Sequence, residues 1–155
     1  MIDLHRILVP TDFSKHSQIA LTYGAAFAAK FGAELYLLHV VQDLALFIPE
    51  AVLAAPPLLP PVEQFVAAAR AALERVVREA NAPGVVIHAE VAEGLPFDEI
   101  VRLARDRNVD LIVMGTHGHT GLAHVLMGSV AEKVVRRAPC PVLTVRHPEH
   151  EFVHP

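Results

Sequence analysis

Apolar runs of strand length alternate along this chain with segments whose apolar residues repeat at helical spacing. The expected strands cover residues 6–10, 35–41, 85–91, 109–114 and 142–146. The expected helices cover residues 14–31, 62–80, 96–108 and 129–137. Strands that alternate with helices are typical of βαβ units and a parallel sheet. The pattern therefore predicts a single doubly wound α/β domain with five parallel strands and four helices.

Local signals support the helices. Gly32 is placed to end the first one, and Pro96 lies near the start of the third, with Asp98 and Glu99 where acids suit the helix dipole. The stripe that we expect to face the core in the first helix is Ile19, Tyr23, Phe27 and Phe31. The corresponding face of the second helix is Val62, Phe65, Val66, Ala69, Leu73, Val76, Val77 and Ala80.

A glycine pattern follows the fourth expected strand. Gly115 is followed after two residues by Gly118, and after nine more by Gly128 and Ser129, which open the last helix. A strand, a glycine loop and a helix N-terminus form an arrangement that binds phosphate, because backbone N–H groups can approach the anion closely. The alternative is that these glycines only make a turn, but a βα loop of this length is unusual without a function.

This glycine pattern resembles that of the ATP-binding branch of the universal stress protein family. Three further segments resemble the family in the same order: Ile7–Ser14, Leu37–Val40 and Cys140–Arg146. The resemblance implies an adenine nucleotide alpha hydrolase-like fold with strand order 3-2-1-4-5. In that order the ends of the first and fourth strands are neighbours, so Asp12 and Gly115 are expected at one cleft. The implied ligand is ATP, with or without Mg²⁺.

The resemblance also implies roles for individual residues. Asp12 would bind the ribose or the adenine edge, Val40 would offer backbone hydrogen bonds to adenine, and the phosphates would lie on the glycine loop and the helix start. The complete set of expected nucleotide-binding residues is Pro10, Thr11, Asp12, Val40, Met114, Gly115, His117, Gly118, His119, Gly128, Ser129 and Val130. Asp12 has the alternative role of a helix cap, and Thr11 that of an ordinary turn residue.

Three histidines lie within the glycine loop: His117, His119 and His124. Their spacing fixes no coordination face, and no cysteine or carboxylate cluster accompanies them, so we expect no metal site. We expect His117 or His119 to donate to the phosphates or to stay solvated. Family members often carry a basic residue at the position of His119, whose charge here would depend on pH. We interpret His39 as a structural residue at a strand end.

Composition excludes several classes of protein. The formal net charge is −4 and the basic residues form no long run, so we expect no nucleic-acid partner. The single cysteine, Cys140, allows no internal disulfide, and we interpret it as a structural residue of a protein in a reducing compartment. No signal peptide and no apolar run of about 18 residues is present, so we expect a cytoplasmic protein without membrane contact.

Two segments depart from the βα alternation. Residues 44–61 are apolar but contain five prolines, which excludes one regular helix and favours a lid over the ligand cleft. A contact with a partner protein or a second subunit is the main alternative. We assign residues 1–146 to the α/β domain and residues 147–155 to a loosely held C-terminal tail.

The resulting functional hypothesis is an ATP-binding regulatory module that acts in stress responses through an unidentified protein partner. The alternatives are a slow ATP hydrolase or adenylyl-transferring enzyme, and a ligand-free interaction protein. The chain has no P-loop and no lysine in its glycine loop, which argues against fast phosphoryl transfer. Strand five, Val142–Arg146, is an apolar edge, and the family resemblance points to a homodimer through it.

Overall fold

The computed structural model describes residues 1–42, 60–117 and 127–146. Within these residues it contains, in chain order, β1 (Arg6–Pro10), α1 (Lys15–Phe31), β2 (Glu34–Val41), α3 (Val62–Glu79), β3 (Ile87–Glu93), α4 (Pro96–Asp106), β4 (Leu111–Gly115), α5 (Ser129–Arg137) and β5 (Val142–Val145). The strands form one parallel sheet in the order β3-β2-β1-β4-β5. The predicted fold class and the strand order are therefore confirmed.

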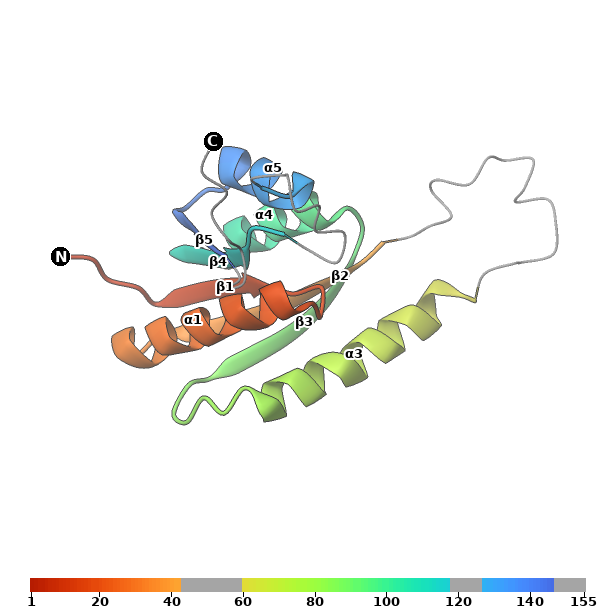
Figure 1. Cartoon of the computed structure of the whole chain (residues 1–155), viewed down its shortest axis with the longest axis horizontal. Helices are drawn as coiled ribbons and strands as arrows, with labels where there is room; N and C mark the ends of the chain where they lie inside the picture. The colour runs from red at the N-terminus through yellow and green to blue at the C-terminus, as the bar shows by residue number, and fades with distance from the viewer. Residues whose placement is uncertain (43–59, 118–126, 147–155) are drawn as a thin grey trace, which may run out of the picture.

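The sheet lies between two layers of helices (Figure 1). Helices α1 and α3 cover one face and α4 and α5 cover the other, and each face has its own apolar core. The central strands are buried on both sides, which explains why they read as unbroken apolar runs. Fully buried side chains from these strands include Ile7, Leu8, Val9, Leu35, Leu37, Leu38, Ile112 and Val113.

Several element boundaries differ from the sequence prediction. The third strand begins at Ile87, two residues later than expected, because the turn that ends at Gly84 (φ 78°) is followed by an extended approach to the sheet. The fourth strand begins at Leu111, since the carboxylate of Asp110 accepts hydrogen bonds from the backbone N–H groups of His5 and Arg6. The later start of β4 depends on contacts with residues far away in the sequence, which no local pattern contains.

The buried face of α1 also differs from the predicted stripe. Tyr23 is 50% exposed, while Ile19, Phe27 and Phe31 only flank the core. The residues that the helix buries are small or medium-sized: Ser17, Ala20, Leu21, Gly24 and Ala28. Small side chains on this face let the helix lie close to the sheet. The predicted face of α3 is closer to the observed one, but Phe65 is 43% exposed.

Gly24 is the residue that permits this close packing. A Cβ atom added there would lie 2.5 Å from Cγ2 of Val9, which is fully buried and stiff because it is β-branched. Glycine in a helix interior costs about 1 kcal/mol relative to alanine. We therefore expect the clash to exceed the propensity gain, so that Gly24→Ala lowers the free energy of unfolding by about 1–2 kcal/mol. Urea denaturation measures this change.

Thr22→Ala serves as the matched control for Gly24→Ala, because Thr22 lies on the exposed side of the same helix. This substitution changes helix propensity without a core contact, and we expect no loss of stability from it. A Gly24→Ala variant more stable than the natural chain would contradict the proposed close contact between α1 and β1.

Three sequence-based expectations lie outside the described residues. They are the lid over residues 44–61, of which only residues 60–61 are described, the loop positions Gly118, His119 and His124, and the C-terminal tail. In the part of the chain that is described, no helix is long and apolar enough to cross a membrane.

Candidate functional site

The fold places a topological switch point between β1 and β4. Strand β1 pairs with β2 on one side and with β4 on the other. Helix α1, which follows β1, lies on one face of the sheet, and α5, which follows β4, lies on the opposite face (Figure 1). Because these connections leave in opposite directions, we expect a crevice outside the carboxyl ends of the two strands, which is where ligands of open α/β sheets bind.

The turn from β1 into α1 forms one side of this crevice. Thr11 is buried, and its backbone N–H donates to the carbonyl of Leu38 at 2.8 Å. The Thr11 hydroxyl accepts from the N–H of Phe13 at 3.1 Å, and the Asp12 carboxylate accepts from the N–H of Ser14 at 3.0 Å. Ser14 itself caps the helix. Asp12 thus supports the turn, while the cap belongs to Ser14.

Phe13 holds an unusual conformation in the same turn. Its φ is 64°, in the left-handed region that a bulky side chain rarely adopts. Its ring lies 4.4 Å, centroid to centroid, from the ring of His39, whose Nδ1 donates to the carbonyl of Thr11 at 2.8 Å. His39 is therefore tied to the turn, as the structural interpretation expected. Strained turns of this kind are held by their surroundings and cluster at functional sites.

The end of β4 touches the first turn of α1. A Cβ atom added to Gly115 would lie 3.1 Å from the backbone carbonyl of His16. A side chain at Gly115 would therefore crowd the packing between β4 and α1, a role for this glycine that the sequence did not reveal. The ring of His16 lies 5.9 Å from that of His117, which is buried and has its Nδ1 3.0 Å from the Thr116 hydroxyl.

The N-terminus of α5 adjoins the same strand end. The backbone N–H of Gly128 donates to the carbonyl of Thr116 at 2.6 Å, and an added Cβ would lie 3.1 Å from that oxygen. The helix starts at Ser129, and its first backbone bond runs from Glu132 to Gly128. The first N–H groups of a helix lack intrahelical partners and carry positive partial charge. A potential anion site therefore lies at the end of β4.

The remaining predicted residues lie at or near the ends of the central strands. Pro10 ends β1, and Met114 is buried one residue before the end of β4. In β2, the backbone carbonyl of Leu38 accepts a hydrogen bond from the β1 side. The carbonyl of Val41 accepts one from the N–H of Gly94, on the β3 side. The backbone N–H and C=O groups of successive residues point to opposite sides of a strand, so those of Val40 point toward the β1 side, as those of Leu38 do. Val40 lies beyond Leu38, which pairs with the last residue of β1. Val130 packs against the core under α5.

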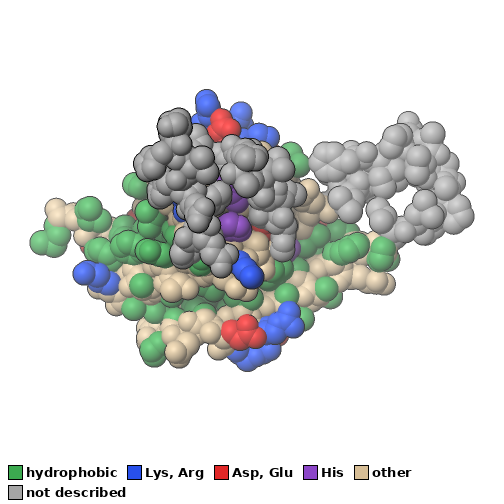
Figure 2. Space-filling model, in the orientation of Figure 1, with side chains coloured by type: hydrophobic (Ala, Val, Ile, Leu, Met, Phe, Trp, Pro, Cys, Tyr) green, Lys and Arg blue, Asp and Glu red, His purple; other side chains and the backbone are tan. Residues whose placement is uncertain are grey.

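His16 connects the two predicted parts of the site, the turn after β1 and the glycine-containing end of β4. Sequence reasoning did not select His16, although its place in the first turn after β1 points to the crevice in any doubly wound fold. Figure 2 shows histidine side chains near the middle of one face of the molecule. Among the described residues no group of three His, Cys, Asp or Glu side chains could hold a metal ion.

Cys140 lies apart from this crevice, just before β5, and is partly buried. Burial, followed by the negative charge of Asp110, raises the pKa of the Cys140 thiol. A raised pKa lowers the thiolate fraction at neutral pH, and the thiolate is the reactive species. This environment agrees with a structural cysteine and disfavours a nucleophile.

Comparison with known proteins gives one consistent family. The model of the universal stress protein family matches residues 4–146. Universal stress protein MJ0531 of Methanocaldococcus jannaschii is 41% identical over 94% of this chain and 84% of its own length. The solved structure of MJ0577 of the same organism has a TM-score of 0.79 at 32% identity and covers 96% of this chain and 99% of that one.

A universal stress protein solved in complex with cAMP has a TM-score of 0.63 at 28% identity, with 94% of this chain and 98% of that one covered. The matched residues of the family model include all five strands of the sheet and the start of α5. The chain therefore belongs to the universal stress protein family.

Proposed function

We propose that this protein is a regulatory module that binds ATP in the crevice between the ends of β1 and β4. The observation that carries the proposal is the hydrogen bond from Gly128 N–H to Thr116 carbonyl. It holds the N-terminus of α5 beside the end of β4, where the first N–H groups of the helix, which have no intrahelical partners, can receive a phosphate. The relative that was solved with cAMP supports an adenine nucleotide as the ligand class.

The roles of the other residues follow from their positions. The phosphates would lie at Ser129 and Val130. The glycine pattern of the sequence adds Gly118 and His119 to the expected phosphate contacts. Asp12 would contact the ribose, since it stands at the turn that borders the crevice. The backbone of Val40, which points past the end of β1, would pair with the adenine edge. Pro10, Thr11 and Met114 would form the walls.

Mass spectrometry of the purified protein, released from its ligand by acid, tests the proposal directly. We expect a retained adenine nucleotide, and isothermal calorimetry of the stripped protein should show binding of ATP but not of GTP. Titration with and without Mg²⁺ defines the bound species. A stripped protein that is folded and binds no adenine nucleotide at millimolar concentration would reject the proposal in favour of a ligand-free interaction protein.

The alternative function is slow ATP hydrolysis or adenylyl transfer. Asp12 and His117 are the described candidates for a catalytic base, and both already support the local backbone or a neighbouring hydroxyl. We therefore expect turnover to be orders of magnitude below the roughly 10 s⁻¹ typical of enzymes. A phosphate-release assay measures it. Turnover near that value, abolished by His117→Ala, would establish the enzyme.

We also propose that the protein is a homodimer through β5, the edge strand next to β4. An apolar edge of this kind invites pairing with another strand, and a two-fold partner protects both copies at once. The carbonyl of Pro141 accepts a hydrogen bond from the N–H of Ile112 in β4, and the carbonyl of Val145 accepts one from the N–H of Thr116, just after β4. Because successive residues of a strand point their backbone N–H and C=O groups to opposite sides, those of Val142 and Thr144 point away from β4. They are available to the strand of a partner subunit.

A further inference from the structure

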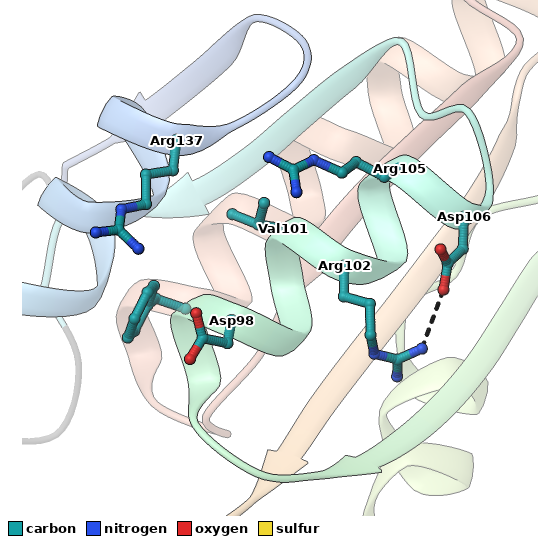
Figure 3. Close-up of a pocket in the computed structure, with 7 residues that line it drawn as sticks. Asp98, Val101, Arg102, Arg105, Asp106 and Arg137 are labelled. Atoms are coloured by element: carbon teal, nitrogen blue, oxygen red, sulfur yellow. Dashed lines mark hydrogen bonds and ion pairs between the residues drawn. The ribbon is translucent and has the colours of Figure 1, made fainter.

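A pocket lies between α4 and α5, on the face of the sheet opposite α1 (Figure 3). Its volume is about 420 Å³. Its lining residues are Phe97, Asp98, Val101, Arg102, Arg105, Asp106 and Arg137. None of them belongs to the proposed nucleotide site, so the pocket is a separate feature of the molecule.

The arginines of this pocket differ in their surroundings. Arg102 forms ion pairs with Glu99 and Asp106, one helical turn away on each side. Arg105 and Arg137 form no ion pair with another residue in the described parts of the chain. Figure 3 shows them on neighbouring helices beside the same pocket, with Arg102 turned toward Asp106. The pocket therefore offers two guanidinium groups whose charge no ion pair within the described residues neutralises.

The floor of the pocket is partly apolar. Val101 is buried, and the ring of Phe97 is partly exposed. Two cations lie over this ring: Nζ of Lys133 at 4.8 Å and the guanidinium of Arg137 at 5.6 Å. The ring and the two cations therefore form a surface that combines apolar area with positive charge. Such a surface suits a ligand that carries an anionic group beside an apolar one.

We propose that the α4–α5 pocket binds an acidic segment of a partner protein. A carboxylate of the segment lies between Arg105 and Arg137, and a neighbouring apolar side chain lies on Phe97 and Val101. The volume is within the range of pockets that hold drug-sized ligands, far more than one small anion fills. Asp98, which also lines the pocket, can accept a backbone N–H of the segment. The proposal does not depend on ATP binding.

Fluorescence anisotropy with two labelled peptides tests the proposal. The probe is Glu-Glu-Phe-Glu-Glu, and the reference is Gln-Gln-Phe-Gln-Gln. We expect the acidic peptide to bind about tenfold more tightly, and the Arg105→Gln/Arg137→Gln double variant to lose about that factor. Raising the salt concentration from about 50 mM to about 500 mM should weaken binding as well, because the charges are near the surface.

Arg70→Gln is the matched control. Arg70 is an exposed arginine of α3, on the other face of the sheet, so its loss changes the net charge without reaching the pocket. Equal peptide affinity in the natural chain and the double variant would overturn the proposal, and so would an equal loss in Arg70→Gln. Two other results would assign the pocket to a different ligand. One is displacement of the acidic peptide by millimolar inorganic phosphate alone, and the other is Arg105-dependent binding of single-stranded DNA without binding of the peptide.

Discussion

Thr144→Pro should weaken the proposed dimer while each subunit stays folded. The N–H of Thr144 points away from β4, so proline there removes a donor that only the partner strand would use. Because the two subunits of a two-fold dimer are equivalent, each of them loses this hydrogen-bond donor. With roughly 1 kcal/mol for each bond lost, the dimer dissociation constant should rise about 10- to 100-fold. Light scattering across a concentration series measures it.

Val145→Pro is the control at the neighbouring position. Its N–H faces β4 and its side chain is buried, so proline there breaks the internal ladder and should cost about 3 kcal/mol of stability or more. The two variants should therefore separate assembly from folding. If Thr144→Pro stays fully dimeric and folded, the interface lies elsewhere, and a natural chain that is monomeric at micromolar concentration excludes the dimer itself.

Gly128→Val should abolish tight ATP binding while the sheet remains folded. An added Cβ would lie 3.1 Å from the carbonyl of Thr116, which accepts the N–H of Gly128 itself, and the branched side chain of valine adds further bulk. The N-terminus of α5 must then move away from the end of β4. We expect ATP affinity to fall at least about tenfold, which corresponds to roughly 1.4 kcal/mol. Calorimetry on the stripped protein measures the change.

Gly84→Ala is the control for an indirect effect through stability. Gly84 has φ 78° in the turn before β3, so alanine there adds backbone strain but meets no atom within 4 Å. This variant should lose stability and keep its ATP affinity. Unchanged affinity in a folded Gly128→Val protein would show that α5 does not receive the phosphates, and the proposed nucleotide geometry would be wrong.

The order of the elements could be predicted because each strand and helix carries its own periodicity. The apolar runs of the central strands follow from burial on both faces, and the turn at Gly32 (φ 67°) is a local signal as well. The buried face of α1 could not be predicted in this way. Large apolar residues such as Tyr23 dominate the pattern, but the sheet approaches so closely at Gly24 that the small residues face it.

The candidate site shows the same division. Sequence pattern selected Asp12, Gly115 and Gly128, and the fold brings their segments together at the switch point. The pattern predicts that Gly115 approaches a phosphate, and the structure adds a second close neighbour, the backbone of His16, in a helix that follows a different strand. Spacing within the chain carries no information about such a contact.

Periodicity and the glycine pattern were sufficient to predict the fold class, the succession of strands and helices, and the segment that begins α5. Only the packed fold shows which side of β5 faces outward, that a Cβ atom at Gly115 would crowd the backbone of His16, and that Arg105 and Arg137 line one pocket. The reason is the distance along the chain over which each signal acts. Periodicity and caps depend on residues within a few turns, whereas register, close approach and charge pairing depend on atoms that only the packed sheet and helices bring together.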